Sequence, residues 1–331
     1  MGAGAPPLLR VEDLTIEIEG VEVVDGVSFD VSPGQVMALV GESGCGKSIT
    51  AFALLGLLPD VARIARGRIV LGETEISLLS EREMRRLRGK DISIIFQEPG
   101  ASLDPLTTAG SQIVEALRQH EKLTGSAARE RARQMLETVG ISDPEKRLDQ
   151  YPFELSGGMC QRIMIAIALI CSPSLLVADE PTTALDVTIQ AQILDVMRKL
   201  IAERGTSIVF ITHDMGVVAD MADQVAVMYA GRIAEVGPVE AIFAQPAHPY
   251  TALLLASVPR LDIAAKSLLA TIPGSVLPPE EFGVGCRFSP RCPLSSERCT
   301  REQPPLFDAA GGSRSACWHI DHVGELARQA A

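Results

Sequence analysis

The sequence predicts an α/β fold in which helices cover both faces of a parallel sheet. Three uninterrupted apolar runs are typical of strands buried on both faces, and helical segments separate them; they cover residues 36–40, 175–178 and 207–212. Strands that alternate with helices favour a parallel sheet, because each helix returns the chain to the edge where the next strand begins. The chain of 331 residues, 47% of them hydrophobic, is long enough for one large domain and a smaller one.

Antiparallel strands are expected before the first buried strand, and a helical insertion is expected after it. Residues 8–34 alternate apolar and polar side chains, with turn residues at 19–20 and 32–34, as short antiparallel strands do. A hairpin is expected around Ala230 and Gly231. Helical periodicity with start and stop residues predicts helices at about 47–57, 113–119, 127–139, 156–170 and 187–203. The helical insertion covers about 97–160.

The last quarter of the chain has a different character. Prolines become frequent beyond residue 244, and four of the seven cysteines gather there. Frequent prolines interrupt regular helices and strands, so this part is expected to be rich in loops. We therefore expect one domain over residues 8–244 and a small C-terminal domain over residues 245–331.

The charge balance excludes one class of function. With 30 basic and 42 acidic side chains the net charge is −12, whereas a general nucleic-acid binder needs a basic surface. No secretory signal opens the chain, and no apolar run reaches the roughly 20 residues of a membrane-spanning helix. We expect a soluble chain without a nucleic-acid partner that meets a membrane through another protein. Its cysteines are expected to be reduced thiols or metal ligands.

A phosphate-binding loop is the clearest chemical signal. Residues 41–48 fit the pattern G-x-x-x-x-G-K-[ST] between a predicted buried strand and a predicted helix. Glycines let consecutive N–H groups turn toward a β-phosphate, and the helix directs its positive end at the same anion. Lys47 then reaches the β- and γ-phosphates, and the Ser48 hydroxyl binds Mg²⁺. The expected ATP contacts on this loop are Gly41, Ser43, Gly44, Cys45, Gly46, Lys47, Ser48 and Ile49.

Two carboxylates follow the second buried strand. Asp179 stands at its carboxyl end, where it is expected to hold Mg²⁺ through water. Glu180 is the next residue, placed to act as general base toward the attacking water. Such a pair is often no more than a solvated strand end, but its position downstream of a phosphate loop favours the catalytic interpretation.

The order of several short motifs resembles that of the ABC ATPases. Residues 155–159, Leu-Ser-Gly-Gly-Met, resemble the LSGGQ signature of that family, and Phe96-Gln97, Ala184-Leu185-Asp186 and His213 stand where the family has its other motifs. The resemblance covers about residues 8–240. It implies a P-loop NTPase (RecA-like) core with an antiparallel β subdomain and a helical insertion.

The resemblance also implies roles for these residues. Gln97 would sense Mg²⁺ and touch a membrane partner, and His213 would hold the γ-phosphate and orient Glu180. Ser156 and Gly158 would contact the γ-phosphate of ATP bound to an opposite subunit, and Asp186 would lie at the dimer interface. The sequence departs from the family in two places. Ile18 stands where an aromatic residue usually stacks on adenine, and Met159 replaces the signature glutamine.

The segment 245–251, Gln-Pro-Ala-His-Pro-Tyr-Thr, narrows the resemblance to oligopeptide and dipeptide importer ATPases, a group that includes nickel importer subunits. His248 is expected to be structural. The resemblance implies a second, similar ATPase subunit, two transmembrane permease subunits and an extracytoplasmic solute-binding protein. It places the chain peripherally at the cytoplasmic face of the inner membrane, where it would power peptide import. Import of nickel or another small solute, or a role outside transport, remain alternatives.

Four cysteines of the C-terminal region form a candidate metal site. Structural zinc usually uses at least one close C-x2–4-C pair, and the spacing here contains none. Four thiolates on an irregular loop also suit a [4Fe–4S] cluster, and a metal centre would supply folding energy to a small domain. An iron–sulfur cluster, a zinc site and unligated thiols all remain open. The four residues are Cys286, Cys292, Cys299 and Cys317.

Overall fold

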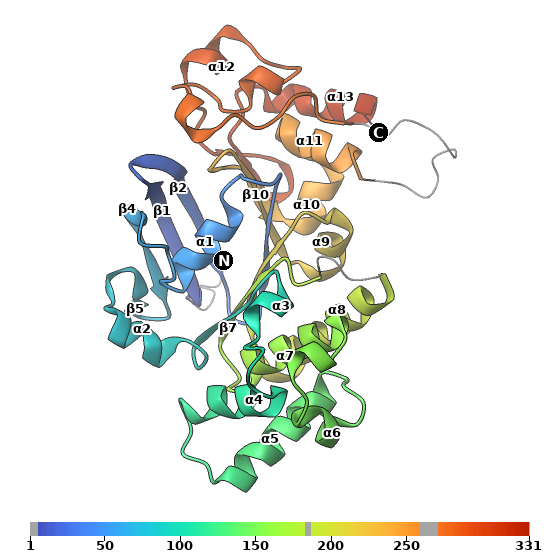
Figure 1. Cartoon of the computed structure of the whole chain (residues 1–331). Coiled ribbons are helices and arrows are strands. Elements are labelled where there is room, and N and C mark those ends of the chain that lie inside the picture. Colours follow the sequence, from blue (N-terminus) through green and yellow to red (C-terminus); the bar gives the residue numbers. More distant parts are fainter. Residues whose placement is uncertain (1–5, 183–186, 259–270, 331) are drawn as a thin grey trace. The chain divides into compact units, whose positions relative to one another are not determined.

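The computed structural model describes residues 6–182, 187–258 and 271–330, and Figure 1 shows the course of the chain. The chain forms two compact units, each assembled from separate stretches of the sequence. The first consists mainly of residues 78–210, and the second consists of residues 9–30, 36–77 and the part from residue 211 onward. The motifs of the sequence are therefore divided between two bodies.

The first unit contains the second and third of the buried strands expected from the sequence. Strand β6 pairs in parallel with β7, with Ile92 opposite Leu175, and β8 lies beside β7. Every residue of β7 and β8 is buried, which explains why both are nearly continuous apolar runs. The elements of this unit are α2 (Glu81–Leu87), β6 (Ile92–Ile95), α3 (Pro99–Ser102), α4 (Ala109–Arg118), α5 (Gly125–Thr138), α6 (Pro144–Leu148), α7 (Gly157–Leu169), β7 (Leu175–Asp179), α8 (Val187–Arg204) and β8 (Ser207–Thr212).

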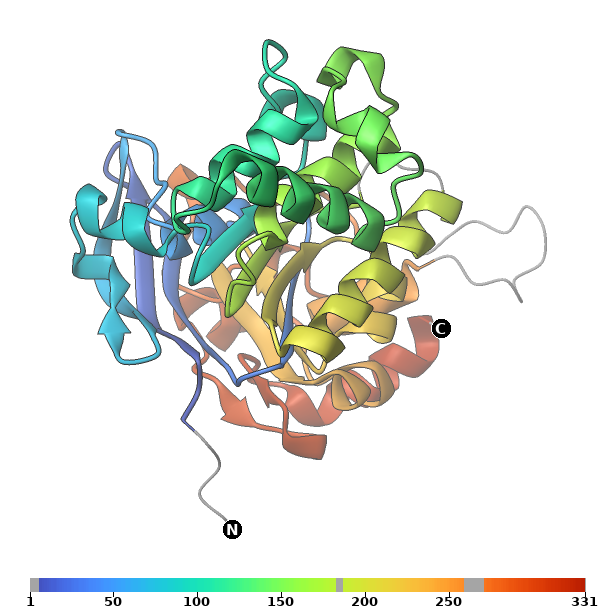
Figure 2. The same cartoon turned by 90° about the horizontal axis from the view of Figure 1, so that it is seen from below.

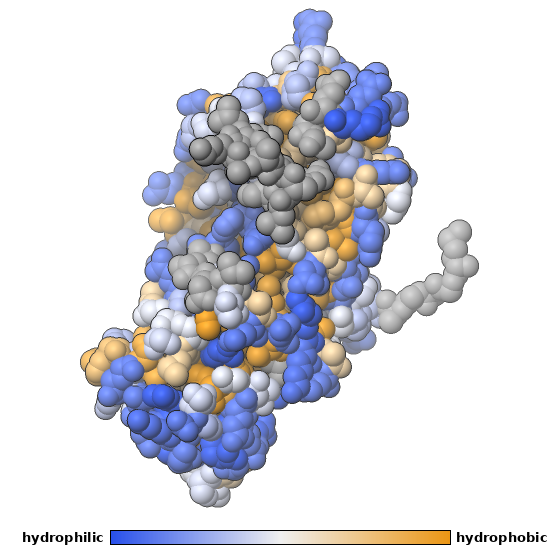
Figure 3. Space-filling model, turned by 90° about the vertical axis from the view of Figure 1, so that its right-hand side faces the viewer, coloured by the Kyte–Doolittle hydropathy of each residue, from blue (hydrophilic) through white to orange (hydrophobic). Residues whose placement is uncertain are grey.

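Helices α4 to α7 form one group in the first unit, drawn in green in Figures 1 and 2. Threonine side chains cap two of them: Thr108 accepts a hydrogen bond from the Ser111 N–H in α4, and Thr124 accepts one from the Ala127 N–H in α5. Hydrophilic side chains predominate in the lowest part of Figure 3, at the level where Figure 1 shows α5. Arg129 of α5 forms ion pairs with acidic residues of the neighbouring segment.

A four-stranded antiparallel sheet in the second unit has the order β2-β1-β4-β5. Strand β1 is amphipathic, and its acidic side chains pair with arginines of β4 across the strands. Arg63 bonds to Glu17 at 2.6 Å and Arg68 bonds to Glu12 at 2.5 Å. The strands are β1 (Leu9–Ile18), β2 (Val21–Val31), β4 (Ala62–Leu71) and β5 (Thr74–Glu75).

The other strands of the second unit follow the order β11-β12-β10-β9-β3. Strands β3 and β9 are parallel, whereas β9, β10, β12 and β11 are successively antiparallel. Helices α11 and α13 pack against each other. The remaining elements of this unit are β3 (Val36–Val40), α1 (Lys47–Leu54), α9 (Met215–Met221), β9 (Gln224–Tyr229), β10 (Arg232–Pro238), α10 (Val239–Ala244), α11 (Pro249–Ala256), α12 (Glu297–Arg301), β11 (Phe307–Asp308), β12 (Arg314–Ser315) and α13 (Ile320–Ala330).

Most elements expected from the sequence are present, with shifts at their ends. The hairpin turns at Ala230 and Gly231, whose φ angles are 47° and 79°. Helix α1 ends at Leu54, three residues before the expected end, because Gly56 adopts a left-handed φ of 62° just beyond it. No helix in the described ranges combines the length and the apolar composition needed to cross a membrane.

Candidate nucleotide-binding site

The phosphate loop, residues 41–48, joins β3 to α1 in the second unit, and its backbone requires glycine. Gly44 and Gly46 have φ angles of 79° and 101°, in the left-handed region that other residues rarely adopt. At Gly41 a Cβ atom would lie 2.2 Å from the carbonyl oxygen of Met228. Gly46 is also the N-cap of α1, so the N-terminal end of that helix adjoins the loop. The loop therefore has the backbone of an anion-binding site.

The loop is held from within by Lys47, the residue that begins α1. Its buried ammonium donates hydrogen bonds to the carbonyl oxygens of Gly41 and Glu42 at 2.8 and 3.0 Å. Cys45 is fully buried, and its carbonyl oxygen accepts a hydrogen bond from the Gly231 N–H at 3.0 Å. The loop is thus also tied to the turn of the β9–β10 hairpin, and the Cys45 side chain is part of the core.

The other expected ATP contacts of the loop differ in exposure. Ser43 is exposed, whereas Ser48 and Ile49 are half-buried on the first turn of α1. Ile18, where the family usually has an aromatic residue, is the half-buried last residue of β1. Asp186 lies outside the described residues.

The first unit brings two of the expected catalytic residues into contact. Asp179 is the buried last residue of β7, and Glu180 follows with an unusual φ of 46°. The side-chain amide of Gln97 donates a hydrogen bond to the Glu180 carboxylate at 3.1 Å. A left-handed backbone at a glutamate is strained, and this conformation turns the Glu180 backbone away from the strand direction. The sequence placed Gln97 and Glu180 in separate motifs 83 residues apart, and the fold joins them.

The signature segment begins α7 with a serine cap. The Ser156 side chain accepts a hydrogen bond from the Met159 N–H at 3.3 Å, and Ser156 itself is exposed. A Cβ atom at Gly158 would meet Ile189 at 3.3 Å, so glycine permits close packing against α8. Further along α7, the buried Gln161 donates to the carbonyl oxygen of Pro181 at 2.5 Å. The signature helix is therefore attached to the backbone directly after Glu180.

His213 belongs to the second unit and directly follows β8. It is exposed, and the next residue caps α9: the Asp214 carboxylate accepts hydrogen bonds from the N–H groups of Gly216 and Val217. The cap ends the strand and starts the helix within three residues, so it fixes the backbone that carries His213. The expected nucleotide residues are thus distributed over both units, with the phosphate loop and His213 in one and the carboxylates, Gln97 and the signature in the other.

Two family models match the chain. The model described as ABC transporter matches residues 24–183, and the model described as Oligopeptide/dipeptide transporter, C-terminal region matches residues 234–299. The Dipeptide transport ATP-binding protein DppD of Bacillus subtilis is 50% identical over 310 residues, which are 93% of this chain and 92% of that protein. The chain belongs to the ABC transporter family, in its oligopeptide and dipeptide group.

Other relatives agree with this assignment. The Probable peptide ABC transporter ATP-binding protein y4tR of Sinorhizobium fredii is 48% identical over 324 residues, 96% of this chain and 97% of that protein. Among solved structures, cbiO1 from Clostridium perfringens, part of the ABC transporter complex cbiONQ, is 28% identical. The TM-score is 0.63, and the superposition covers 73% of this chain and 92% of the cbiO1 chain. The expected fold class is confirmed, and the chain is an ABC ATPase.

In this ABC ATPase a buried carboxylate anchors the His-Pro-Tyr segment. Glu235 on β10 is fully buried and accepts hydrogen bonds from the N–H groups of Ala247 and His248 at 2.8 and 3.0 Å. The His248 ring in turn accepts a hydrogen bond from the Tyr250 N–H at 3.0 Å and so caps α11. Burial raises the pKa of Glu235 to about 7 and lowers the pKa of His248 to about 3. His248 therefore has a structural position, as expected.

The four late cysteines line one small cavity, together with His248, Phe288 and His319. Burial raises the pKa of the Cys292 and Cys317 thiols to about 12 and about 11, and the other cysteines of the cavity add to both shifts. All seven cysteines are free thiols, so none forms a disulfide. Within the described ranges, no three His, Cys, Asp or Glu side chains are grouped as a single metal ion requires.

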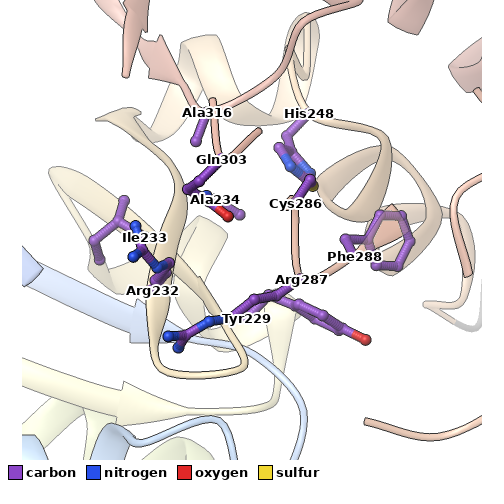
Figure 4. A pocket seen from close by; sticks show the side chains of 10 residues that line it. All are labelled: Tyr229, Arg232, Ile233, Ala234, His248, Cys286, Arg287, Phe288, Gln303 and Ala316. Carbon is purple, nitrogen blue, oxygen red and sulfur yellow. The ribbon is translucent and has the colours of Figure 1, made fainter. Parts of the chain in front are cut away.

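Sequence reasoning missed two arginines that attach the C-terminal region to the rest of the second unit. The first is Arg287, which pairs with the buried carboxylate of Asp25 at 2.6 Å. Arg232 of β10 pairs with the same carboxylate at 2.5 Å. The second is Arg291, which pairs with Glu42 of the phosphate loop at 2.6 Å. Figure 4 shows Arg232 and Arg287 at a pocket that Cys286 and His248 also line. The partners are separated by up to 262 residues, and no local pattern could have joined them.

Proposed function

We propose that this ABC ATPase powers the import of dipeptides or oligopeptides. One observation carries the proposal: a single chain joins the ABC transporter region to the oligopeptide/dipeptide C-terminal region, and it matches a dipeptide transport ATP-binding protein along 93% of its length. In this proposal residues 8–244 form the ATPase domain, and residues 245–331 form the C-terminal domain of the importer group.

ATP binding begins at the phosphate loop. Its N–H groups and the start of α1 would hold the β-phosphate, and Lys47 would exchange its bonds to the loop carbonyls for bonds to the β- and γ-phosphates. Ser48, Gln97 and Asp179 would hold Mg²⁺, which neutralises charge that develops on the phosphates. All three offer the oxygen ligands that Mg²⁺ prefers. Apolar contact with Ile18 would replace the usual aromatic stacking on adenine.

Hydrolysis requires a base and its orientation. Glu180 would polarise the attacking water, and His213 would hold the γ-phosphate. The hydrogen bond from Gln97 at 3.1 Å supports a link between the loop that meets a membrane partner and the base. When the membrane partner moves that loop, the orientation of Glu180 would change with it. This coupling would make hydrolysis depend on the state of the transporter.

The exposed signature supports a partner ATPase subunit. Ser156 and Gly158 would contact the γ-phosphate of ATP on that subunit, and Asp186 would lie at the interface. The complex would contain two transmembrane permease subunits and receive peptide from an extracytoplasmic solute-binding protein. The chain would then lie at the cytoplasmic face of the membrane, held there by the permeases.

Reconstitution tests the function. The chain is purified with its permease subunits and second ATPase in proteoliposomes, and ATP hydrolysis is measured with a solute-binding protein loaded with a peptide library or with nickel. We expect peptide to stimulate hydrolysis and to accumulate inside, and Lys47→Ala to abolish both. Stimulation by nickel alone would assign a nickel importer. A chain that never associates with permeases would overturn the transport proposal.

We further propose that Cys286, Cys292, Cys299 and Cys317 hold a metal centre, most simply a [4Fe–4S] cluster, that stabilises the C-terminal domain. Four thiolates around one zinc ion would lie about 3.8 Å apart, because each Zn–S bond is about 2.3 Å. The four thiols share one cavity but are not grouped for a single ion. Their position around one cavity supports a common centre, which would supply folding energy to the surrounding loops.

Metal analysis tests this second proposal. The chain is purified without oxygen, and iron, sulfide and zinc are measured per chain. About four irons would support the cluster, as the [4Fe–4S] formula requires, and one zinc would support the alternative site. Serine at any one of the four positions should lower the metal content, whereas Cys171→Ser should not. Metal-free protein with a folded C-terminal region would contradict both centres.

A further inference from the structure

Two residues of the C-terminal region form hydrogen bonds with Glu42 of the phosphate loop, one with its backbone and one with its side chain. The phenol oxygen of Tyr250, on α11, accepts a hydrogen bond from the Glu42 N–H at 2.8 Å. The guanidinium of Arg291 donates two hydrogen bonds to the Glu42 carboxylate, at 2.6 and 3.0 Å. Glu42 is the second residue of the loop, so its backbone and its side chain are both fixed from outside the ATPase motifs.

Arg291 is itself rigidly held. Its side chain is only 6% exposed, and it also donates to the carbonyl oxygens of Pro273 and Ile272 at 2.7 and 3.3 Å. A further hydrogen bond, at 3.3 Å, reaches the hydroxyl of Tyr229 at the end of β9. The bond to Glu42 raises the pKa of the Arg291 guanidinium. A planar guanidinium fixed at several points keeps the carboxylate it binds in one position.

Aromatic packing fixes the other contact. The rings of Tyr229, Tyr250 and Phe288 pack together, with centroids 4.7 to 5.4 Å apart. Tyr250 is fully buried, and its α11 backbone is capped by His248, which is bonded to Glu235. The phenol oxygen that receives the Glu42 N–H therefore has little freedom to move.

The charge of Glu42 matters for a loop that binds a polyphosphate. An unpaired carboxylate on this loop would repel the phosphates of ATP, and Glu42 is 29% exposed, so water screens it only in part. Arg291 neutralises the carboxylate and draws it toward the C-terminal region. One uncompensated charge about 10 Å from the phosphates, at an effective dielectric constant of about 20, changes the affinity by about tenfold.

We propose that Arg291 and Tyr250 are positioning residues for ATP binding, which hold the phosphate loop in place and cancel the charge of Glu42. This gives the C-terminal region a part in nucleotide affinity as well as any part in assembly. The proposal rests on ATP binding at the phosphate loop.

Equilibrium binding of a fluorescent ATP analogue to the purified full chain tests the proposal. Arg291→Met, which removes the charge and keeps the length, should raise the Kd about tenfold. Adding Glu42→Gln to Arg291→Met should restore the Kd to within about threefold, because the repelling carboxylate is gone. A purely structural role for Arg291 would not be rescued in this way. Arg301→Met, at an exposed arginine of α12, should leave the Kd unchanged.

Each outcome decides the matter. An unchanged Kd for Arg291→Met, or no recovery in the double variant, would overturn the charge argument. If Arg291→Met does not fold, Glu42→Gln alone remains informative: it keeps an acceptor for Arg291 and adds one net positive charge, so ATP should bind about threefold more tightly. Equal or weaker binding would overturn the proposal. Lys47→Ala should abolish binding in every background, and if it did not, the loop itself would not be the ATP site.

Discussion

A buried carboxylate should make the stability of this protein fall as the pH rises toward neutrality. Glu235 is buried on β10, and its carboxylate accepts hydrogen bonds from the N–H groups of Ala247 and His248. Two N–H groups favour the charged carboxylate, but burial disfavours it more strongly, and the pKa of Glu235 rises to about 7 from an ordinary value of 4.5. Glu235→Gln removes the ionisation and keeps the shape of the side chain.

The sign follows from the two protonation states. Between pH 4.5 and about 7 the folded protein keeps a proton on Glu235 that the unfolded chain has released. The contribution of Glu235 to stability is therefore greatest below pH 4.5, falls through this window and is fully lost above pH 7. At about 1.4 kcal/mol for each pH unit, the loss amounts to about 3 kcal/mol. Glutamine lacks this loss but forms one N–H bond fewer, which costs about 1 kcal/mol at every pH.

Urea denaturation between pH 5 and pH 8 measures the difference. Glu235→Gln should be slightly less stable than the natural chain at pH 5 and about 2 kcal/mol more stable at pH 8. Glu240→Gln, at an exposed position of α10, is the matched control and should keep the pH dependence of the natural chain. If the natural chain and Glu235→Gln change in parallel across the range, the Glu235 carboxylate is not destabilised by burial and the reasoning is wrong.

Three further predictions concern other parts of the molecule. Glu180→Gln should retain ATP binding and hydrolyse ATP at least ~100-fold more slowly in the assembled transporter, and near-normal steady-state turnover would contradict its role as base. Ser156→Arg should impair hydrolysis by the assembled complex and leave ATP binding by the isolated chain intact, whereas an equal loss in the isolated chain would argue against contact across subunits. Asp25→Asn should lower the free energy of unfolding by about 3 kcal/mol, because it leaves the buried Arg287 without its anion. Urea denaturation checks this, and a loss below about 1 kcal/mol would show that the pair is screened like a surface pair.

Much of the fold could be predicted because its signals are local. Continuous apolar runs mark the buried strands, and Gly205 marks the end of α8. Strand β4 could not be predicted from the sequence, because its arginines interrupt the alternation of apolar and polar residues. Those arginines pair with acidic residues of β1, the neighbouring strand. The segment gives no sign of that partner within itself.

The candidate site divides in the same way. The phosphate loop could be found because the glycines, lysine and serine of its motif stand within eight consecutive residues. The contact between Gln97 and Glu180 could not be predicted, because it forms only when β6 and β7 pair in the sheet. The contact between Glu42 and Arg291 joins residues 249 positions apart. Nothing in the local sequence around an arginine in a proline-rich loop indicates which carboxylate it will pair with. Only the packing of α11 and the Ser289–Arg291 turn brings it to the phosphate loop.

Strands β12 and β11 extend the sheet that also contains β3, the strand before the phosphate loop. Strand β12 pairs with β10 through Glu235 opposite Ser315, and the Ser315 hydroxyl donates to the carbonyl oxygen of Ala247. A chain shortened to end at α10 would leave that side of β10 with open N–H and C=O groups, a surface on which strands of other molecules can add. Attempts to prepare a minimal cassette from this protein should therefore meet aggregation, and a soluble short form would need a charged residue or a proline on the newly exposed side of β10.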